Sequence, residues 1–164
     1  PLMWKTGHSL VKAKMKETNS PLAGEMSGHI FFADKYYGFD DALYAAIRMI
    51  NIVFALKENL SLAKRSMGKT FSTPEIRVNC SEERKFAIVD ELKANLKANN
   101  VEFNDVDGVR VNEENGWWLI RASNTQAVLV ARCEASSNKF LKELKGNLKK
   151  QLEFCKVEIP KELK

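Results

Sequence analysis

Residues 109–133 decide the fold of the second half of the chain, and they read VRVNEENGWWLIRASNTQAVLVARC. Apolar and polar residues alternate over residues 109–112, which is the period of a strand with one buried face. Glu-Asn-Gly at 114–116 is typical of a tight turn between strands. Two further apolar runs follow, at residues 117–120 and 127–133, and a polar loop separates them. The stretch therefore predicts three consecutive strands joined by short connections.

The sequence on either side completes a compact domain. Residues 75–80 alternate in the same way and predict a fourth strand. A helix is expected from near Ser81 to residues 99–100, with one apolar face formed by Phe86, Val89, Leu92 and Leu96. A last helix over about residues 138–154 places on one side Leu141, Leu144, Leu148 and Leu152. The order β-α-β-β-β-α predicts an α+β domain of about ninety residues.

The first sixty residues indicate part of a separate α/β domain. We expect strand-like structure at residues 1–5, a short helix at 10–17 and an extended segment at 22–32. Next comes a helix that Asp40 or Asp41 can cap, with an apolar stripe of Leu43, Ile47, Ile50 and Phe54. Because this helix is apolar nearly all round, it should be buried against a sheet larger than residues 1–40 can supply. Residues 57–74 are expected to be a linker.

Composition and charge narrow the class of protein. The 164 residues are 45% hydrophobic and 29% charged, which excludes collagen-like and low-complexity chains. The longest apolar stretch, residues 42–56, contains Arg48 and Asn51 and is too short for a membrane span. Three cysteines without a C-x-x-C support neither a zinc site nor a disulfide framework, and they suit a reducing cytosol. The net charge of +5 fits an anionic small ligand, a nucleic acid, or solubility alone.

The first candidate site is Gly-Glu-Met-Ser-Gly-His at residues 24–29. If this segment is extended, Glu25, Ser27 and His29 project to one side. A carboxylate that accepts two hydroxyl hydrogens, beside a hydroxyl and an imidazole, suits the vicinal diol of a sugar. The alternative is an ordinary strand end whose polar side chains face water.

The second candidate is the loop Arg-Ala-Ser-Asn-Thr at residues 121–125. It combines a guanidinium, two hydroxyls, an amide and backbone N–H groups, with no acidic residue. Phosphate oxygens only accept hydrogen bonds, so this set of donors matches a phosphate. The alternative is a polar hairpin loop with no ligand.

Three further motifs are weaker. Thr-Gly-His-Ser at residues 6–9 precedes a lysine-rich helix, so it either holds an anion or caps that helix through His8 and Ser9. Gly-Lys-Thr at residues 68–70 is not a P-loop, because Ala63 stands where the first glycine must be. The Trp-Trp pair at 117–118 either stacks on nucleic-acid bases or buries one ring in a core.

Taken together, four motifs resemble the α-D-phosphohexomutase family, in its bacterial phosphomannomutase/phosphoglucomutase branch. They are Lys-Thr-Gly-His at 5–8, Gly-Glu-Met-Ser-Gly-His at 24–29, Gly-Phe-Asp-Asp at 38–41 and Arg-Ala-Ser-Asn-Thr at 121–125. The resemblance implies that residues 1–66 are the C-terminal part of the family's three-layer α/β domain III. It also implies that residues 71–160 are its domain IV, a TATA-binding-protein-like α+β domain.

The resemblance also implies an activity and roles for individual residues. Members of the family are isomerases that interconvert hexose 1-phosphate and hexose 6-phosphate, here of mannose or glucose, through a hexose bisphosphate that also serves as activator. By this resemblance Glu25 and Ser27 hold sugar hydroxyls, and His8 and His29 line the same sugar site. The phosphate-binding residues would be Arg121, Ser123, Asn124 and Thr125.

The family's phosphoserine loop and its Asp-x-Asp-x-Asp-Arg magnesium loop do not occur in these residues. We therefore expect a C-terminal fragment of a cytoplasmic, Mg²⁺-dependent enzyme, inactive alone and partnered by the missing N-terminal domains, without nucleic acid or membrane. The alternatives are a basic nucleic-acid-binding α+β module and a non-catalytic phosphosugar-binding protein.

Overall fold

The computed structural model describes residues 1–164 and divides them into two compact units, Pro1–Gly68 and Lys69–Lys164. Each unit has its own cluster of buried apolar side chains. Both units combine helices with antiparallel strands, so the expected mixture of α and β structure is confirmed. None of the helices is both long enough and apolar enough to cross a membrane.

The first unit is built on a small hairpin. Its elements are α1 (His8–Thr18), β1 (Leu22–Gly24), β2 (Ile30–Phe32), α2 (Ala42–Ala55) and α3 (Leu60–Ser66). Strands β1 and β2 pair antiparallel, and α1 contributes Val11 and Met15 to a buried cluster with Phe31 of β2. The expected strand at residues 1–5 is wrong, because these residues have no regular structure. The expected extended segment at 22–32 is extended only at its two ends, since a turn divides it into two strands.

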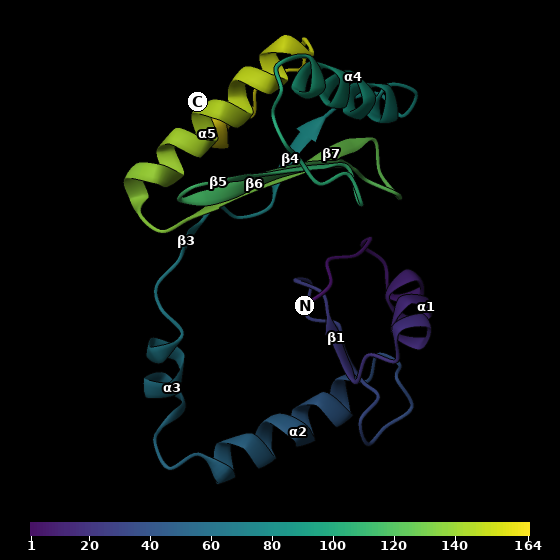
Figure 1. Cartoon of the computed structure of the whole chain (residues 1–164), viewed down its shortest axis with the longest axis vertical. Helices are drawn as coiled ribbons and strands as arrows, with labels where there is room; N and C mark the ends of the chain where they lie inside the picture. The colour runs from purple at the N-terminus through teal and green to yellow at the C-terminus, as the bar shows by residue number, and fades with distance from the viewer. The chain divides into compact units, whose positions relative to one another are not determined.

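Helix α2 forms where the sequence indicates, but it is not buried. Asp41 caps it, because its carboxylate accepts the Tyr44 N–H at 2.9 Å. No residue of α2 is buried, and Leu43 and Phe54 are 74% and 86% exposed. Figure 1 shows the helix leading away from the hairpin. The expected burial requires a sheet larger than residues 1–40 supply, and the two strands here, of three residues each, offer too little apolar surface to cover such a helix.

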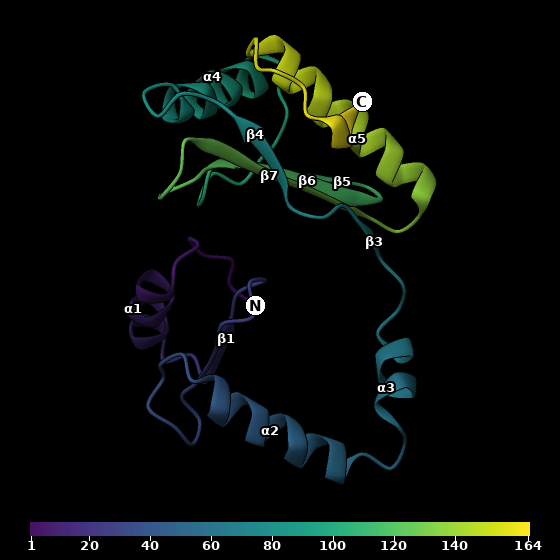
Figure 2. The same ribbon diagram turned by 180° about the vertical axis from the view of Figure 1, so that it is seen from behind.

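The second unit is a five-stranded antiparallel sheet with helices on one face. Its strands are β3 (Phe71–Ser72), β4 (Ile76–Asn79), β5 (Val109–Glu113), β6 (Gly116–Ala122) and β7 (Val128–Ala135). The strand order is β3-β7-β6-β5, and β4 also pairs with β7. Helices α4 (Lys85–Ala98) and α5 (Asn138–Phe154) lie over the same face of this sheet (Figure 1), and a short 3-10 helix, η1 (Lys161–Leu163), follows them. The view from behind shows β4 running alongside β7 (Figure 2).

The expected linker at residues 57–74 contains more structure than predicted. It includes α3 and, near its end, β3, whose two residues pair with Glu134 and Ala135 of β7. Between β3 and β4, the Thr73 hydroxyl accepts the Cys133 N–H at 3.1 Å. The next residue, Pro74, has no N–H to offer the ladder. The Thr73 hydroxyl thus continues the pairing along β7 where the proline interrupts it.

The core of the second unit follows the alternation read in residues 109–133. Trp118, Ile120 and Ala122 of β6 are buried beneath the helices, while Trp117 on the other face is partly exposed. From α5, Leu144, Leu148 and Leu152 are buried as expected and Leu141 is partly buried. These contacts confirm the predicted faces of β6 and α5.

The apolar face predicted for α4 is wrong at one residue. Phe86 is 56% exposed, whereas Lys85 and Ile88 are buried with Val89, Leu92 and Leu96. The helix begins at Lys85 rather than near Ser81. Phe86 lies about 100° around the helix from Lys85, which places it beside the buried stripe.

Candidate functional site

The Glu-Met-Ser-Gly-His motif forms the tip of the β1–β2 hairpin. Its turn is closed by two backbone hydrogen bonds, from the Glu25 N–H to the His29 carbonyl at 2.9 Å and from the Gly28 N–H to the Glu25 carbonyl at 3.0 Å. Gly28 has φ of 96°, a conformation that favours glycine. The strand-like alternation predicted for Glu25, Ser27 and His29 is therefore wrong. The turn instead leaves Ser27 and His29 exposed and Glu25 partly buried.

The Glu25 carboxylate joins two motifs that are separate in the sequence. Its Oε1 accepts the Gly7 N–H at 2.7 Å, and Gly7 is the residue that precedes α1. No side chain of α1 itself caps the helix, so capping by His8 or Ser9 does not occur. A carboxylate at this end satisfies an orphan N–H and interacts favourably with the helix dipole. His8 is the first residue of α1 and is exposed beside this contact.

His29 has an acidic partner that follows the hairpin in the sequence. Its Nδ1 is hydrogen-bonded to Oδ2 of Asp40, and both side chains are partly exposed. This hydrogen bond and the negative charge of Asp40, assisted by Glu25, raise the pKa of His29 above its usual 6.5. The imidazole is thus favoured in its protonated form, in which both ring nitrogens donate hydrogen bonds.

We expect Asp40→Asn to lower the pKa of His29, as followed by NMR titration of the imidazole. Because the folded-state pKa is raised, the His29–Asp40 pair stabilises the first unit fully below about pH 6.5 and loses this effect as the pH rises through the folded-state pKa. Asp34→Asn is the matched control, because Asp34 pairs with Arg48 instead. An unchanged His29 titration in Asp40→Asn would contradict the assignment.

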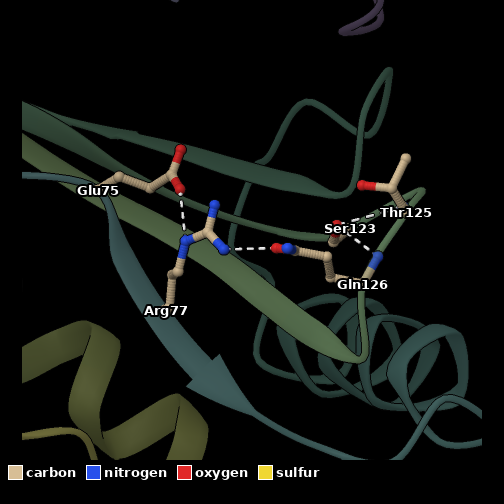
Figure 3. Close-up of polar contacts among 5 residues, drawn as sticks. All are labelled: Glu75, Arg77, Ser123, Thr125 and Gln126. Atoms are coloured by element: carbon tan, nitrogen blue, oxygen red, sulfur yellow. Dashed lines mark hydrogen bonds and ion pairs between the residues drawn. The ribbon is translucent and has the colours of Figure 1, made fainter.

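In the second unit, the predicted phosphate-binding residues lie at the end of β6 and in the loop that follows. Arg121 belongs to β6 rather than to the loop, which corrects the predicted boundary. The Ser123 side chain turns inward and is only 7% exposed. Its Oγ accepts the Thr125 N–H at 3.4 Å and the Gln126 N–H at 3.2 Å (Figure 3). The same turn leaves Asn124 and Thr125 exposed.

The electrostatics around Arg121 include an acidic residue that sequence reasoning missed. Asp107, in the turn before β5, places its Oδ2 3.9 Å from Arg121 Nε. The Arg121 side chain is 19% exposed, so Asp107 offsets part of its charge while part of the side chain stays accessible. No local pattern connects these residues. Only the pairing of β5 with β6 brings the turn close to Arg121.

Arg77 and Gln126 are further polar residues at this site that the sequence did not indicate. Arg77 Nη1 donates to the Gln126 side-chain oxygen, and Arg77 Nε donates to Glu75 Oε1 at 3.0 Å (Figure 3). In the sheet register, Arg77 and Arg121 both lie opposite Val130, one on each side of β7. Directly paired residues project to the same face, so two guanidiniums flank Val130 on the face away from the helices.

Comparison with known proteins identifies the family of this chain. The model of phosphoglucomutase/phosphomannomutase α/β/α domain III matches residues 1–70, and the model of the C-terminal domain of the same enzymes matches residues 75–151. The chain belongs to the phosphoglucomutase/phosphomannomutase family. The resemblance drawn from the four sequence motifs is thereby confirmed.

Individual members of the phosphoglucomutase/phosphomannomutase family match nearly the whole chain. A phosphomannomutase/phosphoglucomutase of Pseudomonas putida is 46% identical over 92% of the chain and 33% of its own length. The Pseudomonas aeruginosa protein of the same name is 42% identical over 98% of the chain and 35% of its own length. A solved structure of a family protein from Burkholderia thailandensis has a TM-score of 0.87 and 41% identity, over 98% of this chain and 34% of that one. The chain thus spans about a third of the length of these relatives.

The residues of this chain do not fit a bound Mg²⁺. No group of three or more His, Cys, Asp or Glu side chains is placed to share a metal ion. The cysteines do not suggest another chemistry, since burial raises the pKa of Cys133 to about 12 and that of Cys155 to about 11. These residues instead provide two sets of polar and charged groups that can bind a ligand, one set in each unit.

Proposed function

We propose that this chain recognises phosphosugars, mannose or glucose phosphates, within a cytoplasmic phosphohexomutase. The reaction would interconvert hexose 1-phosphate and hexose 6-phosphate through a bisphosphate, with Mg²⁺ and the phosphoserine supplied by residues outside this chain. The observation that carries the proposal is the Arg121–Gln126 segment, which presents exposed hydrogen-bond donors beside a guanidinium in a chain of this family. Phosphoryl transfer asks a protein mainly for positioning and charge neutralisation.

In this proposal the second unit binds the phosphate that is not being transferred. Arg121 supplies the positive charge and a planar fork of donors that matches phosphate oxygens. Asn124 and Thr125, at the exposed tip of the loop, supply uncharged donors. The Ser123 hydroxyl accepts two loop N–H groups and retains its own hydrogen to donate.

The first unit would bind the sugar. Gly7 uses one oxygen of the Glu25 carboxylate, and the other oxygen is assigned to sugar hydroxyls. Ser27 and His29 are exposed on the same turn, and in its protonated form, which Asp40 favours by raising the pKa, His29 adds a charged donor. His8 begins α1 beside the Gly7–Glu25 contact and is assigned to the same sugar site.

Titration with glucose 6-phosphate, followed by NMR, tests the phosphate assignment. We expect the amide signals of residues 121–125 to shift with a Kd on the order of millimolar, because a single clamp makes few contacts. Arg121→Ala should abolish these shifts, whereas Lys142→Ala, which removes one charge from α5, should preserve them. Unphosphorylated glucose should cause no shift in the loop.

Salt and oligonucleotide separate this proposal from nucleic-acid binding. Neutralising one phosphate should make the glucose 6-phosphate affinity only weakly dependent on salt, whereas nucleic-acid binding falls steeply with salt. Shifts of Trp117 and of the α5 lysines with oligonucleotide, without loop shifts from glucose 6-phosphate, would contradict the proposal.

A further inference from the structure

A buried lysine lies next to the phosphate loop, and nothing above gives it a role. Lys85 is the first residue of α4, yet its side chain is only 1% exposed. Lysine is almost never buried to this extent without a partner. The position is also unfavourable in itself, because the N-terminus of a helix carries partial positive charge. Some contact of the Lys85 ammonium must therefore offset its burial.

Two acceptors meet this ammonium. Nζ lies 2.5 Å from Glu82 Oε1 and donates to the backbone carbonyl of Gln126 at 3.2 Å. The Glu82 carboxylate is 65% exposed, so water solvates that side of the pair. The centroid of the Phe86 ring lies 5.2 Å from Nζ, so this exposed ring covers another side of the ammonium. The remaining contact reaches the loop that follows β6.

The Gln126 carbonyl accepts more than one hydrogen bond in that loop. It also accepts the Val128 N–H at 2.9 Å, while the Gln126 N–H donates to Ser123 Oγ at 3.2 Å. The peptide groups on both sides of Gln126 are thus oriented by hydrogen bonds, one of them from a buried charge. Hydrogen bonds from charged groups are roughly twice as strong as neutral ones. Lys85 therefore contacts the loop at its end next to β7, while Asn124 and Thr125 lie at its tip.

We propose that Lys85 is a positioning residue that holds the Ser123–Gln126 loop in the conformation that binds phosphate. The inference rests on the proposed phosphate-binding function of Arg121 and this loop. Lys85 does not touch the ligand in this arrangement. It acts through the Gln126 carbonyl, and the Ser123 turn then orients the exposed donors.

The test compares Lys85→Met with Arg84→Met in the full chain. Both variants remove one positive charge at the start of α4, but the Arg84 side chain is half exposed and pairs with Glu91 instead of the loop. We expect Lys85→Met to weaken glucose 6-phosphate binding about tenfold and to accelerate hydrogen exchange of the Val128 amide by a similar factor. Arg84→Met should change both by less than about threefold. Equal effects of the two variants, or an unchanged Val128 amide in Lys85→Met, would overturn the inference.

Two further outcomes separate the role of Lys85 from the proposed function and from a folding defect. If the unmodified chain does not bind glucose 6-phosphate, the proposed function fails, and exchange of the Val128 amide alone decides whether Lys85 holds the loop. If Lys85→Met does not fold, the ammonium signal of Lys85 in the unmodified chain decides. A hydrogen-bonded, buried ammonium should give a slowly exchanging ¹⁵N signal near neutral pH that moves when glucose 6-phosphate is added. A signal lost to exchange, as for surface lysines, would overturn the inference.

Discussion

Gly108→Ala is expected to remove most of the stability of the second unit. Gly108 has φ of 80°, and a Cβ there would lie 2.4 Å from the Ile120 carbonyl oxygen and 2.7 Å from Arg121 Cα. Backbone strain and overpacking each destabilise by about 1–3 kcal/mol, so a total of about 2–6 kcal/mol is expected. Because the clash falls on the backbone of Ile120 and Arg121, the variant should also displace the guanidinium that we assign to phosphate.

Gly146→Ala is the matched control for this prediction. Gly146 lies within α5, and a Cβ there meets no atom within 4 Å. Replacing a helical glycine by alanine should stabilise by about 0.5–1 kcal/mol. Urea denaturation followed on amide signals of β6 measures both variants. Equal midpoints for Gly108→Ala and Gly146→Ala would contradict the prediction.

Trp118→Ala is expected to destabilise the second unit by about 3–5 kcal/mol. The indole is 2% exposed beneath the helices, and its Nε1–H donates to Glu113 Oε1 at 3.1 Å. Truncation would leave a large cavity next to α5 and remove this hydrogen bond. Urea denaturation followed on β7 amides would measure the loss.

The neighbouring tryptophan provides the comparison. Trp117 lies on the opposite face of β6, where the Arg110 guanidinium sits 4.7 Å from its ring centroid. Trp117→Ala should therefore lose only about 1 kcal/mol, the size of a partly exposed cation–π contact. A loss in Trp117→Ala as large as that in Trp118→Ala would show that the two faces are not as unequal as their burial indicates.

The sequence predicted the second unit well because its elements are local and periodic. Alternation over residues 109–112 and the Glu-Asn-Gly turn correspond to β5, β6 and the connection between them. The leucine spacing in residues 138–154 matches α5 at both ends. In each case neighbours in the sequence carry the information, since one face of each element packs on the core.

The features that the sequence did not predict depend on contacts between residues far apart in the sequence. Nothing near Glu25 indicates that its carboxylate accepts the Gly7 N–H, and nothing near Lys85 indicates a partner in the loop after β6. A lysine in the first turn of a helix is ordinarily expected to be exposed, so the apolar face predicted for α4 includes Phe86 and not Lys85. Likewise the alternation of Glu25, Ser27 and His29 favours an extended segment, although Gly28 marks a hairpin turn.

The unequal cores of the two units have a consequence for how the chain opens. The first unit buries only Val11, Met15 and Phe31, whereas the second has an extensive cluster that includes Trp118 and Leu148. Since local opening is easiest where few apolar contacts must break, the two units should not open as one. A protease would then reach residues 1–68 while residues 69–164 stayed closed, so the Ser123–Gln126 loop would stay intact longer than the β1–β2 turn.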